Sequence, residues 1–128
     1  MKKVLIIEDD DTLRAALIEW LSEEGYEVDG SADVLDAFEQ IENKKPDVIL
    51  TDLIMVNLDG FEVLKKIKDS VHLKDILTIV MSNSGQDKDV EKAISLGAKD
   101  VLVKSDLSLK EIVERVKKVI SESESGNW

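Results

Sequence analysis

The sequence predicts an α/β fold, a doubly wound sandwich built on one five-stranded parallel sheet in the order (βα)5. Two observations support this prediction. Short apolar runs alternate five times with longer segments that have helical periodicity. Three of the runs consist almost entirely of Val, Ile and Leu, which is typical of parallel strands covered by helices on both faces. In sheets of this kind, ligands bind at the carboxyl ends of the strands.

The apolar runs and the helical stripes locate the individual elements. Strands are expected at 4–7 (VLII), 47–51 (DVILT), 76–81 (ILTIVM) and 100–103 (DVLV), with a weaker one at 26–28 (YEV). Gly25 and Gly97 are expected to follow the first and fourth helices at C′-type positions. The side chains expected on the apolar faces of the five helices are Leu13, Ala16, Leu17, Trp20 and Leu21; Val34, Leu35, Phe38 and Ile41; Phe61, Leu64 and Ile67; Val90, Ala93 and Ile94; and Ile112, Val113, Val116, Val119 and Ile120.

Length and charge limit the classes of function. A chain of 128 residues suits one domain, expected over 1–121, with 122–128 (ESESGNW) as a disordered tail or the stump of a linker. The net charge of −11 argues against direct binding to nucleic acid, and the lack of cysteine excludes thiolate metal sites. The sequence has no apolar run of the roughly 18–20 residues that span a membrane, and its start does not resemble a secretion signal. A cytoplasmic location is therefore expected.

Chemically active side chains follow four of the predicted strands. Glu8 and Asp9 follow the first, Asp52 the third, Ser82 the fourth and Lys104 the fifth. Because the carboxyl ends of parallel strands meet at one edge of the sheet, we expect these side chains to lie close together. Taken singly, a serine or lysine here would be an ordinary loop or surface residue, so the joint placement carries the prediction.

This set of groups suits phosphoryl transfer to a carboxylate. Both partners are anionic, and a hard cation such as Mg²⁺ or Mn²⁺ would neutralise them and bind oxygen ligands. Asp9 is expected to bind the metal directly and Glu8 through water. One oxygen of Asp52 would bind the metal while the other attacks phosphorus, with Lys104 and Ser82 contacting phosphoryl oxygens.

The next two acids, Asp10 and Asp11, have a different expected role. They directly precede Thr12 and Leu13, where the first helix should begin. Carboxylates at the N-cap and in the first turn stabilise a helix. We therefore interpret them as helix-capping acids and not as ligands.

From about Lys2 to Ser121, the sequence closely resembles the receiver domain of bacterial two-component response regulators, the CheY-like family with a flavodoxin-like fold. The matching stretches are VLIIEDDDTLR, DVILTDLIMVNLDG (with Asp59 and Gly60 at the turn before the third helix) and SLGAKDVLVK. The resemblance implies that Asp52 accepts a phosphoryl group from a phosphohistidine on a sensor histidine kinase or a histidine phosphotransfer protein. It implies that Glu8, Asp9, Asp52 and the backbone carbonyl of Ile54 bind the metal. Lys104 resembles the family's invariant lysine, and Ser82 the hydroxyl residue that triggers the conformational change.

The resemblance also implies a mode of action. The chain would catalyse only its own phosphorylation and dephosphorylation and would not be an enzyme with an external substrate. It would present an altered surface, made by the fourth helix, the last strand and the fifth helix near Val90, Ile94 and Lys99, to a downstream protein. A monomer without a direct membrane or nucleic-acid partner is expected. Whether it is a terminal switch or a relay that passes its phosphoryl group on stays open.

Several residues depart from the family pattern. Val56 replaces a usual proline, and Val101 replaces the aromatic residue that normally moves with the hydroxyl. Ser105 follows Lys104 where proline is usual, so we expect either a cis Lys104–Ser105 bond or a rearranged trans loop. Asn83 replaces a small residue and is expected to crowd the phosphoryl group.

The loop residues also suggest a slow return to the resting state. Ile54 and Ser84 occupy the positions that tune hydrolysis in the family. An apolar Ile54 cannot orient an attacking water, and Asn83 would reduce its access. We therefore expect slow self-dephosphorylation.

Two alternatives are retained. A degenerate receiver would bind partners without phosphorylation, which the departures Val56, Val101 and Ser105 favour and the intact site residues oppose. A haloacid-dehalogenase-like phosphatase would use the near-match EDDDT (8–12) to the pattern Asp-x-Asp-x-Thr. Glu8 would then be the nucleophile, and its extra methylene would displace the attacking oxygen by more than about 1 Å.

Overall fold

The computed structural model of the chain describes residues 2–55, 58–83 and 87–124. Its centre is a five-stranded sheet in which every pairing is parallel, as the sequence predicts. The strand order is β2-β1-β3-β6-β7. The second strand is therefore added on one side of β1, and the three later strands are added on its other side. The strands are β1 (Lys3–Ile7), β2 (Glu27–Ser31), β3 (Val48–Asp52), β6 (Leu77–Ser82) and β7 (Asp100–Val103). The weakest predicted strand is thus longer than expected and continues to Ser31.

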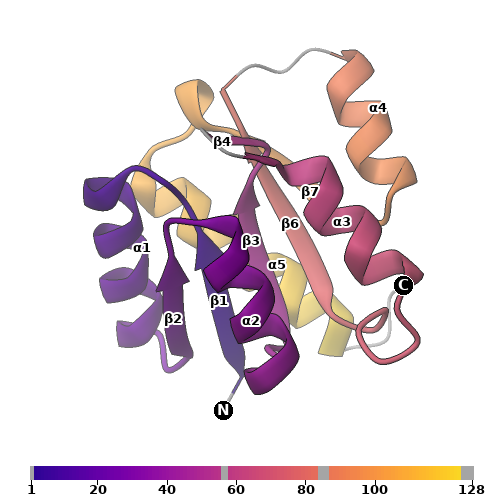
Figure 1. Cartoon of the computed structure of the whole chain (residues 1–128). Coiled ribbons are helices and arrows are strands. Elements are labelled where there is room, and N and C mark those ends of the chain that lie inside the picture. The colour runs from indigo at the N-terminus through magenta and orange to yellow at the C-terminus, as the bar shows by residue number, and fades with distance from the viewer. Residues whose placement is uncertain (1, 56–57, 84–86, 125–128) are drawn as a thin grey trace.

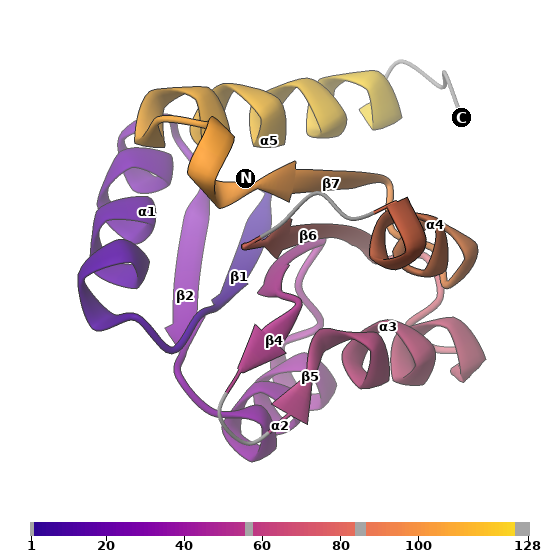
Figure 2. The same ribbon diagram turned by 90° about the horizontal axis from the view of Figure 1, so that it is seen from above.

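Five helices cover the sheet in two layers (Figures 1 and 2). One face carries α1 (Asp11–Glu23) and α5 (Leu109–Glu124), and the other carries α2 (Val34–Lys44), α3 (Gly60–Asp69) and α4 (Asp87–Ser95). Two short elements were not predicted. An antiparallel pair, β4 (Ile54–Met55) and β5 (Leu58–Asp59), lies between β3 and α3, and a 3₁₀ turn, η1 (Lys104–Asp106), follows β7.

The alternation of side chains along β1 shows why the apolar run is continuous. Val4 and Ile6 belong to the core under α1 and α5, whereas Leu5 and Ile7 belong to the core under α2 and α3. Successive residues of a strand point to opposite faces, so a strand covered on both sides buries every side chain and forms a nearly continuous apolar run. All four side chains are at most 2% exposed.

The helical faces agree with the prediction except at three positions. The five predicted core residues of α5 are all buried, as are those of α3 at Leu64 and Ile67. In contrast, Trp20 is 41% exposed, Leu35 80% and Ile94 48%. Each of the three lies next to a buried neighbour that the helix turns toward the sheet: Leu21, Val34 and Ala93 respectively. Adjacent helical residues are about 100° apart, and in these three pairs the buried neighbour takes the direction that faces the sheet while the other side chain turns toward solvent.

Helix ends confirm the role expected for the capping acids. Asp10 is the N-cap of α1, and its Oδ1 accepts hydrogen bonds from the main-chain N–H groups of Thr12 and Leu13, both at 3.0 Å. Asp11 lies in the first turn. Gly25, just after α1, has a φ of 96°, which is the left-handed conformation expected at C′.

The C-terminal helix is longer than expected. α5 continues through Glu124, so residues 122–124 of the segment predicted as a disordered tail are helical. The physical reason is local, since the first strong helix breaker in this region is Gly126. Residues 125–128 lie outside the described part of the chain, and the domain boundary itself stays a prediction. Within the described residues, the helices are too short or too polar to cross a bilayer.

Candidate functional site: a carboxylate cluster with one lysine

The fold brings the predicted acids together at the carboxyl edge of the sheet. β1 and β3 are neighbouring strands, and Glu8 and Asp9 directly follow one while Asp52 ends the other. One carboxylate oxygen from each of the three residues lies within 4.8 Å of the others. Glu8 and Asp52 are buried, whereas Asp9 is exposed to solvent. The cluster is therefore open on the Asp9 side and closed beneath.

Lys104 reaches this cluster from the end of the edge strand β7, which is separated from β3 by β6. Its Nζ donates to Oε1 of Glu8 at 2.5 Å and to Oδ2 of Asp52 at 3.0 Å. The Lys104 side chain is 18% exposed, and that of Glu8 is fully buried. The sequence predicted the proximity of this lysine to Asp52, but not its contact with Glu8.

Burial and charge shift the protonation equilibria of this pair. Burial raises the pKa of the Glu8 carboxyl, and the nearby Asp52 raises it further, while the bond from Lys104 opposes them. Burial alone would lower the pKa of Lys104, but its hydrogen bonds to Glu8 and Asp52 outweigh burial, so the pKa is raised. The lysine therefore remains a cation between two acids.

The donor set suits a hard divalent cation. Three carboxylates face one ammonium group, which leaves a surplus of negative charge at a partly buried site. Carboxylate oxygens with solvent access on one side are the environment that Mg²⁺ and Mn²⁺ prefer, because these ions retain water ligands. The acids present at this edge of the sheet therefore fit the predicted metal.

The end of β3 is packed tightly against the start of α3. The N–H of Gly60 donates to the carbonyl of Leu53, the residue after Asp52. A Cβ at Gly60 would collide with the carbonyl oxygen of Asp52 and lie 2.9 Å from Cα of Leu53. Only glycine permits this approach, so the first residue of α3 supports the main chain that carries Asp52.

The other predicted site residues lie on neighbouring segments. Ser82 is the last residue of β6, is 5% exposed and pairs with Val103, the residue before Lys104. Asn83 is exposed. Ile54 begins β4, two residues after Asp52, and the assignment of its carbonyl as a metal ligand stays a prediction.

Two departures from the family pattern can be located. Cis peptide bonds do not occur in the described ranges, so Lys104–Ser105 is trans and belongs to the 3₁₀ turn η1. Of the two expectations, the trans bond is therefore the one found, and a rearrangement of the loop relative to the family stays a prediction. Val101 is partly buried and packs against the small core at α3 and α4. Val56 and Ser84 lie outside the described residues, and the slow dephosphorylation inferred partly from Ser84 stays a prediction.

One residue with a clear contact to the site was missed from the sequence. The guanidinium of Arg14, in α1, donates to the main-chain carbonyl of Glu8 at 2.8 Å. The only sequence signal was its position three residues after Asp11, which allows a contact across one helical turn.

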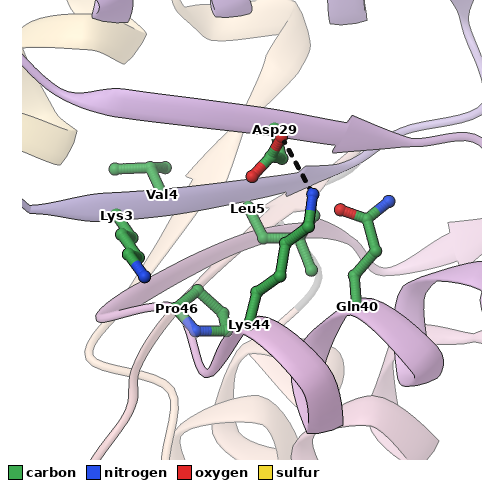
Figure 3. Close-up of a pocket in the computed structure, with 7 residues that line it drawn as sticks. All are labelled: Lys3, Val4, Leu5, Asp29, Gln40, Lys44 and Pro46. Atoms are coloured by element: carbon green, nitrogen blue, oxygen red, sulfur yellow. Dashed lines mark ion pairs between the residues drawn. The ribbon is translucent and has the colours of Figure 1, made fainter.

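A small cavity lies elsewhere, beside the start of β1 (Figure 3). Lys44 of α2 reaches Asp29 of β2 there, at 3.3 Å, and Gln40 points toward the same strand. Lys3 and Pro46 mark it as belonging to the amino-terminal end of the strands, opposite the carboxylate cluster. It is not part of the candidate site.

Comparison with known proteins identifies the family. The model of the response regulator receiver domain matches residues 4–117. The chain is 32% identical over 125 residues to the alkaline phosphatase synthesis transcriptional regulatory protein PhoP of Bacillus subtilis, covering 96% of this chain and 50% of that protein. It is 32% identical over 115 residues to the Regulator of RpoS of Escherichia coli, covering 90% and 34%. The chain thus spans half or less of these curated relatives.

Solved structures agree with this match. A two-component response regulator from Clostridium difficile aligns with a TM-score of 0.86 and 26% identity over 96% of this chain and 98% of that one. The signal receiver domain of a DNA binding response regulator from Colwellia psychrerythraea aligns with a TM-score of 0.85 and 28% identity, covering 94% and 99%. With the family match over 4–117 and the acids at the carboxyl edge, these similarities show that the chain belongs to the response regulator receiver domain family of two-component systems.

Proposed function

We propose that this receiver is a phosphoacceptor switch in which Asp52 takes a phosphoryl group from a phosphohistidine on a sensor histidine kinase or a histidine phosphotransfer protein. The proposal rests on one observation: a lysine and two further acids surround the buried carboxylate of Asp52. Oδ2 of Asp52 lies 3.0 Å from the ammonium of Lys104, and Asp52 shares a cluster with Glu8 and Asp9. A structural aspartate at a strand end has no need of this surrounding.

The chain's own residues would divide the work of the transfer. One oxygen of Asp52 forms a bond to phosphorus while the bond from phosphorus to the histidine nitrogen breaks, and the leaving imidazole takes up a proton. Glu8, Asp9, Asp52 and the backbone carbonyl of Ile54 would hold Mg²⁺ or Mn²⁺, which supplies neutralising charge between two anions. Lys104 and Ser82 would offer an ammonium and a hydroxyl to phosphoryl oxygens.

The proposed output is a protein–protein contact. The chain turns over no external substrate and catalyses only its own phosphorylation and dephosphorylation. The receiving surface is the face made by α4, β7 and α5, where Ile94 is 48% exposed. A cytoplasmic kinase domain as the donor would place a monomeric receiver in the cytoplasm.

The alternatives are less well supported. In the phosphatase alternative Glu8 would attack the substrate, but both of its carboxylate oxygens already accept hydrogen bonds, Oε1 from Lys104 and Oε2 from the N–H of Asp10. The degenerate receiver is favoured by Val101 and Ser105, which replace family residues, but it leaves the cluster of three acids without a role.

Intact-mass measurement after incubation with acetyl phosphate and Mg²⁺ tests the proposal. The wild type is expected to gain one phosphoryl group, and Asp52→Asn none. Asp47→Asn makes the same chemical change just before the other end of β3 and should be labelled like the wild type. A full mass gain in Asp52→Asn, or none in the wild type, would overturn the proposal. Turnover of a phosphomonoester would favour the phosphatase instead.

A further inference from the structure

We propose that Arg14 is a positioning residue that fixes the loop between β1 and α1, and thereby the geometry in which Glu8 and Asp9 receive the metal. The inference deepens the proposed function and rests on it. Arg14 would touch neither the metal nor the phosphoryl group and would act through the main chain of Glu8.

The guanidinium ties together the two ends of this loop. Its Nη1 donates to the carbonyl oxygen of Glu8 at 2.8 Å, and its Nη2 donates to Oδ1 of Asp11 at 2.7 Å. A planar guanidinium presents its donors in a fixed fork, so two acceptors bound to it are held at a fixed separation. Both metal-binding acids, Glu8 and Asp9, lie at or between these two anchors.

Contacts within the loop pass this restraint to the carboxylate. The N–H of Asp10 donates to Oε2 of Glu8 at 3.1 Å, and the N–H of Glu8 donates to the carbonyl of Ser31 at 3.0 Å. With Arg14 on its carbonyl, the Glu8 residue is hydrogen-bonded at its N–H, its C=O and its side chain. A displacement of the loop would therefore move the Glu8 carboxylate.

The aliphatic part of the Arg14 side chain packs over Gly30 of β2. A Cβ at Gly30 in β2 would stand 2.7 Å from Cδ1 of Ile18 and 3.1 Å from Cδ of Arg14. The absence of a side chain at Gly30 thus leaves the space in which α1 and the Arg14 stem pack against β2. The Arg14 side chain is 21% exposed, in contrast to 84% for Asp11.

The strand under Arg14 is itself held from the opposite layer. The carbonyl of Gly30 accepts a hydrogen bond from Nε2 of Gln40 in α2, at 3.1 Å. Figure 3 shows Gln40 extending from α2 toward β2. The loop is therefore supported by a series of contacts: Gln40 of α2 holds Gly30, Arg14 packs over Gly30, and Arg14 bonds to the carbonyl of Glu8.

The simpler interpretation is an ordinary pair between Arg14 and Asp11 across one helical turn. Such pairs contribute little, and they do not involve the loop before the helix. The two interpretations predict opposite signs for metal binding. Loss of a nearby positive charge should strengthen the binding of a cation by electrostatics alone, whereas loss of loop positioning should weaken it.

Calorimetric titration of the unphosphorylated protein with Mg²⁺ alone distinguishes them. Arg14→Met keeps an apolar stem and is expected to raise the Kd for Mg²⁺ by about tenfold, the lower end of the effect for residues that orient metal ligands. Arg14→Lys keeps the charge but not the fork, and an intermediate increase is expected. The matched control is Arg115→Met, which removes the same charge from an arginine that is bound to Asp100 at 2.7 and 2.8 Å.

Gly30→Ala supplies an independent test, because it leaves the guanidinium in place and displaces the stem of Arg14 and Ile18. It should weaken Mg²⁺ binding in the same direction. Urea unfolding of each variant restricts the comparison to samples that are folded. Unchanged or tighter Mg²⁺ binding in Arg14→Met overturns the inference. Absence of Mg²⁺ binding in the wild type would instead overturn the proposed function.

Discussion

The ammonium of Lys104 lies 3.0 Å from Oδ2 of Asp52, although the two residues are 52 positions apart in the sequence. The contact spans the sheet from the end of β7 to the end of β3, which are separated by β6. In the protein without a bound cation, this lysine is the counter-charge of the buried acids. The stability of the metal-free domain therefore depends on this lysine.

Replacing the lysine should destabilise the metal-free domain. Lys104→Met leaves the fully buried Glu8 without its cation, and the loss of one partner of a buried ion pair costs about 3 kcal/mol of unfolding free energy. The control is Lys117→Met, since Lys117 pairs with Glu24 at 3.1 Å with both side chains 42% exposed; it should cost less than about 1 kcal/mol. Urea unfolding in the presence of a chelator measures both. Equal losses would contradict the structural role given to Lys104.

A side chain at Gly60 should disturb the main chain of Asp52. In Gly60→Ala the new Cβ meets backbone atoms of Asp52 and Leu53, which cannot rotate away as a side chain could. We expect a loss of about 2–3 kcal/mol, typical of overpacking. Gly25→Ala is the control, because a Cβ there meets nothing within 4 Å and costs only the strain of a positive φ, about 1 kcal/mol. Urea unfolding that ranked Gly25→Ala as the more damaging change would contradict this packing argument.

The start of α5 should lose stability in acid. Ser108 and Glu111 form a reciprocal pair: the Ser108 N–H donates to Oε1 of Glu111 at 3.0 Å, and the Glu111 N–H donates to Oγ of Ser108 at 3.1 Å. These bonds lower the pKa of Glu111 below its ordinary value of 4.5. A carboxyl whose pKa is lower in the folded state stabilises the fold above the unfolded pKa and loses this effect as the pH falls through the folded pKa.

Glu111→Gln removes this titration. Its stability deficit relative to the wild type should be largest above pH 4.5 and should shrink as the pH falls below that value. Urea unfolding at about pH 6.5 and about pH 3.5 measures the difference. Glu114→Gln changes the same helix outside the capping pair and is the control. A deficit for Glu111→Gln that is constant with pH would contradict the prediction.

The helix α4 should open more readily than α5. Among the α4 side chains that the structure describes, only Ala93 is buried, whereas α5 buries five. A cation–π contact of Lys92 with the ring of Phe61, at 4.2 Å, supplements this small core. Amide hydrogen exchange should therefore be faster in α4, and faster again there in Lys92→Ala, with α5 unchanged. Similar protection of the two helices in the wild type would show that burial does not set the order.

Much of the fold could be predicted from the sequence because the signal is a matter of local pattern. The strand predicted at 47–51 contains the continuous apolar run 48–50, which is typical of a strand covered on both faces, and this run located it within one residue of β3. The boundaries of the first helix were readable from the acids at its start and from Gly25 at its end. The pair β4 and β5 gave no such pattern, since each strand has only two residues.

The grouping of the site residues could be predicted from the geometry of the sheet, but the prediction did not include all of their contacts. Parallel strands bring their carboxyl ends together, so the positions of Glu8, Asp52 and Lys104 after three strands were sufficient to group them. The hydrogen-bond partners of these side chains could not be predicted in the same way. The contact of Arg14 with the Glu8 carbonyl, for example, depends on the space that Gly30 leaves by having no side chain. Exposure of Leu35 was likewise decided by which residue of α2, Val34 or Leu35, turns toward the sheet.

The hydrogen bond from Gln40 to Gly30 has a consequence for the outer strand of the sheet. Glu27 and Ser31 use main-chain groups to bond with the β1 segment, so Gly30, one residue before Ser31, directs its carbonyl outward. The side-chain amide of Gln40 donates a hydrogen bond to that carbonyl, and the neighbouring residue Asp29 places a charged carboxylate on the same strand. An unsatisfied outer strand is a template for pairing with a strand of another molecule. The amide of Gln40 therefore helps to protect the domain against edge-to-edge aggregation.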